Sequence, residues 1–396
     1  PPITTRSDMI TVPTRFRILS DKPLKPKVVI IENPLDGQRG IALKQIKSGA
    51  MTPIYLNQPV FKKKLPVPLQ LSGRIQINDN RFFSVPVNIS AGTILEMAKG
   101  ASIVFKAGVK MEGKPNSPVV FQPAIKKDVW GAVAISSESS AYSQLKNVIM
   151  KGGSGASIGG QRFTAMLSIL DTSDVLLENV NLQDSHFFDD MLHIVYSKNV
   201  KIQNSHFQNA YSDAIDIDMS TVHIDGVTIK NSKNDAIDLM SSSVLVENAQ
   251  IIGSGDKGLS VGEASIVLLL NSLIKNNSIG IESKDRSIAV IHKSSLIDNN
   301  ANLNAYYKNW RYGSGGKILA DTVFLSPSEK PISADKRSSI EIHNIWSSKN
   351  LDTKGDVKLN GFKIATNRLE NAEHRLAIID EILAAWSAGN PEQILP

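Results

Sequence analysis

The chain has 396 residues, with 44 Lys and Arg against 38 Asp and Glu, and no cysteine. The absence of cysteine excludes a disulfide framework, a thiol nucleophile and a thiolate metal site. Residues 1–75 hold 13 Lys and Arg against 4 Asp and Glu, so the rest of the chain is slightly negative. That distribution argues against a basic nucleic-acid-binding surface, and no apolar run reaches the roughly 18 residues that span a bilayer.

Residues 1–80 are rich in proline and basic side chains and contain short apolar runs such as Val28–Ile31. The open end of a stack of strands exposes unpaired backbone groups and invites aggregation. We therefore expect residues 1–80 to form a cap over the N-terminal end of the domain that follows them.

Residues 81–325 carry an internal repeat of about 22 residues. Apolar residues recur at this spacing in several columns, two of which are Ile215, Ile237, Leu259, Ile281, Leu303 and Val200, Val222, Val244, Ile266, Ile288. Apolar and polar residues alternate within each unit, as in a strand, and clusters of Asn, Ser, Gly and Asp separate the strands. Three short strands per unit, with no helix between them, predict one coil of a parallel β-solenoid. The expected fold class is all-β, a parallel β-helix with about 22 residues per coil.

Residues 326–396 form a C-terminal extension whose last part changes to a helical spacing. Its apolar residues stand three or four positions apart, as on one face of an amphipathic helix: Leu369, Ala372, Leu376, Ile379, Leu383 and Trp386. Asn367 and Glu370 fit a capping box, in competition with Thr366 as the N-cap, and Gly389 marks the end. We expect this helix to cover the C-terminal end of the β-helix.

Acidic side chains gather on the outer face of one strand of each coil. Asp216 and Asp218 point outward from the same strand, and Asp238 occupies the position of Asp216 one coil later. Glu282 continues this line, with Ser260 before it. Since neighbouring coils lie about 4.8 Å apart, the carboxylates form a vertical file. Repulsion within the file should raise the pKa of one of them unless a cation intervenes.

Two lysines and a histidine flank this file. His193 stands at its head, and Lys257 and Lys284 are the nearest cations. A structural role is an alternative for some of these groups: Lys284 also fits an ordinary surface salt bridge with Glu282 or Asp285. Three further acids fit turn positions, where Asp bonds to its own backbone: Asp213, Asp235 and Asp256.

Aromatic and basic residues follow the file on the next coil. They are Tyr306, Tyr307, Trp310 and Arg311. Aromatic faces beside charged groups suit sugar rings that bear carboxylates, so we expect these residues and Glu282 to contact a chain-like ligand. The alternative is that they only close the last coils.

Residues 83–325 resemble the right-handed parallel β-helix superfamily, which includes pectate and alginate lyases, polygalacturonases, mannuronan epimerases and phage tailspikes. The segments Ser212–Asp216, Asn234–Asp238, Gly255–Glu263 and Gly280–Asp285 are similar to bacterial β-helix-repeat proteins linked with surface polysaccharide. The resemblance implies an acidic polysaccharide as partner and an extracellular, periplasmic or cell-surface location. Polygalacturonase motifs are echoed only in part, since Lys257 follows Asp256, so hydrolase roles are not carried over.

The resemblance to pectate-lyase-type enzymes implies a calcium site and a basic side chain. Asp216, Asp218 and Asp238 are the expected calcium ligands, because hard cations take oxygen ligands. Calcium would neutralise a uronate carboxylate, and Lys257 or Lys284, with a lowered pKa, would remove the C5 proton.

The function we expect is β-elimination on an acidic polysaccharide, with Lys284, Lys257, Asp238, Asp216 and His193 as catalytic residues. Hydrolysis by two carboxylates and C5 epimerisation are alternatives within the enzyme class, and the separation of the acids would discriminate hydrolysis. An alternative of another class is a non-catalytic glycan-binding or surface-scaffold protein, in which the file is structural.

Overall fold

The computed structural model describes residues 30–32, 39–41 and 67–364. The first two ranges belong to a separate unit, Pro1–Lys64, and form an antiparallel pair of strands, β1 (Ile30–Glu32) and β2 (Arg39–Ile41). The expected C-terminal helix and most of the expected N-terminal cap lie outside the described residues.

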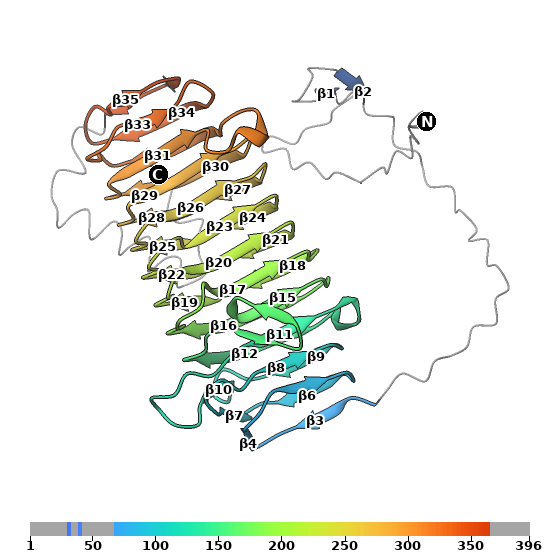
Figure 1. Cartoon of the computed structure of the whole chain (residues 1–396). Helices are drawn as coiled ribbons and strands as arrows, with labels where there is room; N and C mark the ends of the chain where they lie inside the picture. The colour runs from blue at the N-terminus through green and yellow to red at the C-terminus, as the bar shows by residue number, and fades with distance from the viewer. Residues whose placement is uncertain (1–29, 33–38, 42–66, 365–396) are drawn as a thin grey trace, which may run out of the picture. The chain divides into compact units, whose positions relative to one another are not determined.

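The remaining described residues form a parallel β-helix, in which successive coils stack as a ladder of strands (Figure 1). One sheet has 12 strands, all parallel: β5 (Arg81–Phe83), β8 (Ile103–Phe105), β11 (Val133–Ser136), β15 (Ala165–Leu170), β17 (Asp190–Val195), β20 (Asp213–Asp218), β23 (Ile237–Met240), β26 (Lys257–Gly262), β29 (Ile279–Lys284), β31 (Ala301–Tyr306), β33 (Ile332–Ala334) and β35 (Thr353–Lys354).

The other strands of the coils join in a 21-stranded sheet. They are β3 (Leu69–Leu71), β4 (Arg74–Ile77), β6 (Val87–Ser90), β7 (Ile94–Met97), β9 (Val109–Glu112), β10 (Val119–Pro123), β12 (Gln144–Lys151), β16 (Leu176–Gln183), β18 (Val200–Gln203), β19 (His206–Gln208), β21 (Thr221–Asp225), β22 (Thr228–Lys230), β24 (Ser243–Glu247), β25 (Gln250–Ile252), β27 (Ile266–Leu270), β28 (Leu273–Lys275), β30 (Ile288–Ile297), β32 (Lys317–Leu325), β34 (Ser339–Ser347), β36 (Val357–Asn360) and β37 (Lys363–Ile364).

Two kinds of short element interrupt the coils. A hairpin of β13 (Ala156–Ile158) and β14 (Gln161–Phe163) is inserted in one coil, and its buried residues pack against Val104, Ala132 and Ala134. The helical content of the described residues is limited to two 3-10 turns, η1 (Glu138–Ser140) and η2 (Trp310–Tyr312). Accordingly, no helix in this part of the chain has the length and apolarity needed to span a membrane.

The expected 22-residue register is confirmed in the regular coils. Ile215 pairs with Ile237 and Ile237 with Leu259, and all three side chains are fully buried. The alternation of the strand directs the next residue outward, so Asp216 pairs with Asp238 on the opposite face of the same strands.

Buried serines continue this order through one turn of each coil. The backbone N–H of Ser197 donates to Ser220 Oγ, and the same bond recurs from Ser220 to Ser242, from Ser242 to Ser265 and from Ser265 to Ser287, at 2.9 to 3.1 Å. The ladder satisfies backbone donors that a buried turn would otherwise leave unpaired.

The β-helix extends beyond the limits of 81 and 325 that we expected. Leu69 of β3 already pairs with Val87 of β6, and Trp346 of β34 still pairs with Lys363 of β37. The outer and early coils differ in length, since Gln144 pairs with Leu176, 32 residues later. A fixed 22-residue spacing therefore does not detect them.

Candidate functional site

The expected file of polar residues runs along the outer face of the 12-stranded sheet. His193 pairs with Asp216, and the line continues through Asp238, Ser260 and Glu282. It then passes to Asn304 and Ser333 on the following coils. We call this line the polar file.

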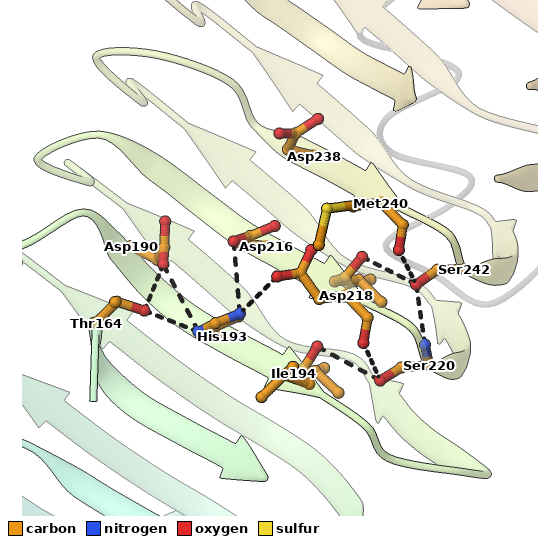
Figure 2. A network of polar contacts seen from close by, with 12 residues as sticks. Thr164, Asp190, His193, Ile194, Asp216, Asp218, Ser220, Asp238, Met240 and Ser242 are labelled. Carbon is orange, nitrogen blue, oxygen red and sulfur yellow. Dashed lines mark hydrogen bonds and ion pairs between the residues drawn. The ribbon is translucent and has the colours of Figure 1, made fainter. Parts of the chain in front are cut away.

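His193 is the centre of a group of carboxylates at the head of the polar file (Figure 2). Its Nε2 lies 3.3 Å from Asp218 Oδ2 and 3.6 Å from Asp216 Oδ2. On the other side of the ring, Nδ1 lies 2.8 Å from Thr164 Oγ1, which also donates to Asp190 Oδ2 at 2.9 Å. We call these five residues the His193 cluster.

The expectation that one carboxyl group of the file has a raised pKa agrees with the electrostatics of Asp216. Burial raises the pKa of Asp216 most, and the charges of Asp190, Asp218 and Asp238 raise it further, to about 10. At neutral pH Asp216 is therefore a carboxylic acid that carries a proton. Asp190, with only 3% of its surface exposed, also has a pKa raised by burial, to about 7.

A second line of acids stands where the strands begin. Asp213 Oδ1 accepts the backbone N–H of Asp235 at 2.7 Å, and Asp235 Oδ1 accepts that of Lys257 at 2.9 Å. These acids therefore bond to the backbone of the next coil, rather than to their own backbone as expected. Burial, as the largest cause, raises the pKa of Asp213 to about 6 and that of Asp235 to about 7.

Lys257 lies at the end of this second line and provides a positive charge beside its acids. Its Nζ pairs with Asp256 and lies 3.5 Å from Asp235 Oδ1 and 3.9 Å from Glu282 Oε1. Burial lowers the pKa of Lys257, but the neighbouring carboxylates outweigh burial and raise it above the ordinary value. The expected lowered pKa is wrong for this lysine, because three acids surround it.

Lys284 has a different environment. It is 6% exposed, its Nζ donates to Ser260 Oγ at 2.9 Å, and it lies 3.9 Å from Asp238 Oδ1. The ion pair that we considered with Glu282 is replaced by this contact with Asp238. Glu282 instead accepts from Asn304 Nδ2 at 2.8 Å.

The aromatic and basic residues expected to contact a ligand are distributed over several elements. Tyr306 pairs with Lys284 in the sheet, and burial raises the pKa of its hydroxyl to about 12. Tyr307 stacks under Arg337, whose guanidinium lies 4.6 Å from the ring centroid. Trp310, 77% exposed, and Arg311 lie in η2. Within the part of the chain that the structure describes, no hydrogen bond or ion pair joins them to the polar file.

The metal ligands that we expected do not converge. Two groups of donor atoms among the described residues lie within 4.8 Å of one another, and they are Asp190, His193, Asp216 and Asp189, Asp190, Asp213. Asp218 and Asp238 belong to neither group. Calcium takes six to eight oxygen ligands, whereas the group at His193 offers one ring nitrogen and two carboxylates. Calcium at Asp216, Asp218 and Asp238 therefore stays a prediction without geometric support.

A depression lies beside the His193 cluster, and we did not predict it from the sequence. It has a volume of about 620 Å³ and is lined by Arg162, Phe187, Phe188, Asp189, Tyr211, Ser212 and Lys233. Tyr211 and Lys233 are 22 residues apart and so occupy the same position in successive coils. The repeat contained this signal, but Arg162 comes from the hairpin strand β14, which lies outside any repeat.

Residues 166–346 match a family model described as a right handed beta helix region. Together with the parallel register of the strands, this match identifies this part of the chain as a right-handed parallel β-helix. No curated protein matches the sequence.

The chain is similar in fold to solved structures of a glucanase, an alginate lyase and a pectate lyase. The chain is similar to the catalytic unit of a GH87 alpha-1,3-glucanase from Streptomyces thermodiastaticus strain HF3-3, with 12% identity, a TM-score of 0.50 and coverage of 74% of this chain and 62% of that chain. For an alginate lyase from Paenibacillus sp. str. FPU-7 the identity is 14%, the TM-score 0.41 and the coverage 68% and 93%. For a pectate lyase from Paenibacillus sp. 0602 the identity is 11% and the TM-score 0.39, with coverage of 57% of this chain and 72% of that chain. At these identities the likeness shows the fold alone.

Proposed function

We propose that the protein processes a polysaccharide, breaking its glycosidic bonds by acid–base catalysis at the His193 cluster. The observation that carries this proposal is the pair formed by Asp216 and Asp238. Asp216 is protonated at neutral pH, whereas Asp238, its neighbour in the polar file, forms an ion pair with Lys284. Two neighbouring carboxyl groups in opposite protonation states are the requirement for glycoside hydrolysis.

The proposed reaction divides the work between these two groups. Asp216 gives its proton to the glycosidic oxygen as the bond between that oxygen and the anomeric carbon breaks. Asp238, as a carboxylate, stabilises the positive charge on the sugar and activates the water that adds to the anomeric carbon. The proton that the water loses returns to the carboxyl pair, so the site is restored after each cycle.

His193 is the positioning residue of this proposal. Thr164 contacts its Nδ1, and its Nε2 faces both Asp216 and Asp218. The ring therefore contacts Asp216 on the outer face of the sheet, where the Asp216 side chain is 20% exposed. We expect a glycan chain to reach Asp216 there. Because polysaccharides of this kind lie outside the cytoplasm, the proposal includes an extracellular, periplasmic or cell-surface location for the protein.

β-Elimination on an acidic polysaccharide is the second candidate, and one observation favours it. Lys284 is almost completely buried, and among the described residues its Nζ makes one hydrogen bond, to Ser260, and one ion pair, to Asp238. A lysine in such a position suits a base that removes the C5 proton of a uronate. Lys257 does not, because its neighbours hold it as a cation.

An assay of chain cleavage tests the proposal. Pectate, alginate and alpha-1,3-glucan are incubated with the protein, and new reducing ends and the absorbance of unsaturated uronates are both recorded. We expect reducing ends without unsaturated product, and a loss of about 10²- to 10⁴-fold in Asp216→Asn, as for removal of a general acid. Asp225→Asn, on β21 of the other sheet, is the matched control.

The other outcomes each exclude the proposal. Unsaturated product that disappears in Lys284→Ala would establish elimination. Binding of a glycan without any cleavage would establish the non-catalytic alternative, in which the polar file is a binding surface.

A further inference from the structure

The depression beside the His193 cluster is lined by two cations and by aromatic rings. Arg162 and Lys233 line it, and neither forms a salt bridge with any residue that the structure describes. Each cation lies over an aromatic ring instead. The guanidinium of Arg162 is 5.9 Å from the centroid of Phe188, and Lys233 Nζ is 4.6 Å from that of Tyr211.

The same depression exposes aromatic surface. Phe187 is 73% exposed and Tyr211 is 42% exposed. Large aromatic side chains of globular proteins bury most of their surface. Two exposed rings beside two cations that form no ion pair with the described residues therefore require an explanation. Aromatic rings suit the apolar face of a sugar, and cations suit an anionic substituent on that sugar.

The chain connects this depression directly to the His193 cluster. Thr164, which contacts His193, follows Arg162 by two residues, and Asp190 follows the lining residue Asp189. Ser212, also in the lining, precedes β20, the strand that carries Asp216. A sugar in the depression would therefore belong to the same glycan chain as the sugar at the cluster.

We propose that this depression is a binding subsite for a uronate unit of the glycan, whose ring stacks on the exposed aromatic surface and whose carboxylate binds between Arg162 and Lys233. The proposal rests on the function proposed above and names its substrate class as a carboxylated polysaccharide. The lining also contains one acidic group, Asp189. Since Arg162 and Lys233 carry two positive charges against this one negative charge, the lining has a net positive charge.

Binding measurements test this subsite separately from catalysis. Calorimetric titrations use the Asp216→Asn variant, with pectate oligomers and the same oligomers after complete methyl esterification, and the oligomers are checked to be intact afterwards. We expect Arg162→Gln and Lys233→Gln each to weaken pectate binding about tenfold, as for loss of one charge-assisted hydrogen bond. Binding of the methyl ester should not change. Tyr211→Ala should weaken the binding of both pectate and its methyl ester, because stacking of the sugar on the ring does not depend on the carboxylate.

The control is Lys201→Gln, which removes an exposed cation from β18 in the other sheet. Equal weakening by Lys201→Gln and Lys233→Gln, or equal weakening for pectate and its methyl ester, would overturn the subsite. Absence of cleavage by the wild-type protein, together with pectate binding that needs Arg162 and Lys233, would contradict the proposed function and leave the subsite intact.

Discussion

Asp216 owes its chemical state to its neighbours. An isolated aspartate is ionised at neutral pH, whereas burial and the charges of four nearby aspartates raise the pKa of Asp216 to about 10. Substitution of one neighbouring aspartate at a time should therefore change the pKa of Asp216 while Asp216 itself is unaltered. The same reasoning separates Lys257, which is surrounded by acids, from Lys284.

We expect Asp218→Asn to move the pH profile of turnover. The substitution removes one negative charge beside Asp216 and so lowers the pKa of Asp216. A general acid works only while protonated, so the alkaline limb of kcat/KM should move to lower pH. The profile of Asp225→Asn should match the wild type. An alkaline limb that stays in place in Asp218→Asn would contradict Asp216 as the acid.

Removal of divalent cations provides a second test at the same residues. Since the donors of Asp216, Asp218 and Asp238 do not converge, we expect turnover to be unchanged after treatment with EDTA and dialysis. Loss of turnover that calcium restores would support the calcium site. It would also contradict Asp216 as the acid, because a bound cation holds a carboxylate in its ionised form.

The beginnings of β20, β23 and β26 are joined by side-chain to backbone hydrogen bonds. Asp213 and Asp235 accept backbone N–H groups of the following coil, so each strand start is tied to the next. Because these acids are buried, the fold favours their protonated forms, and their pKa values are raised to about 6 and about 7.

These raised pKa values predict the direction in which stability depends on pH. The folded-state pKa of Asp213 lies above the ordinary value of 3.8. Its contribution to the free energy of unfolding is therefore complete below pH 3.8 and is lost as the pH rises through about 6. We expect the melting temperature to fall between about pH 4, near the unfolded-state pKa, and about pH 7, the folded-state pKa of Asp235. Asp213→Asn, which keeps an oxygen acceptor but cannot ionise, should reduce this fall, whereas Asp225→Asn should not. Equal falls in all three proteins would contradict this account.

The coils depend on one another for their core, because a single coil cannot bury its apolar face. Ile237 is fully buried between Ile215 and Leu259. We expect Ile237→Asp to abolish cooperative thermal unfolding, since an unpaired charge would enter the core. Ile237→Val should remain folded and lose about 1 kcal/mol in the free energy of unfolding. A soluble, cooperatively melting Ile237→Asp protein would contradict the stacking.

The proposed glycan would lie along the polar file, and the length of the file would limit how many sugar units it contacts. From His193 to Ser333 the file crosses six strand spacings, about 29 Å. A second depression of about 420 Å³ lies near its far end, with Tyr306, Lys330 and Lys354 in its lining. We expect Lys354→Gln to weaken binding of long pectate chains and to leave a disaccharide unaffected, because only a long chain reaches both ends. Equal effects on both ligands in equilibrium titrations would contradict binding along the axis.

The repeat by itself determined the fold class and the neighbours of each residue in the regular coils. Once Ile215 and Ile237 are known to stack, the pairing of Asp216 with Asp238 follows, because parallel strands of equal coils share one register. The spacing of 22 residues is therefore sufficient to place Asp216, Asp238, Ser260 and Glu282 on one line.

Only the tertiary structure decided which side chains of that line meet. The early coils differ in length, so the hairpin that carries Arg162 and the contact of Thr164 with His193 follow no repeat. The charge states of Asp216 and Lys257 depend on burial and on distances of a few ångströms, which spacing along a chain does not contain. A repeat sets the order of residues along the axis, whereas the chemistry of the site depends on the packing around each of them.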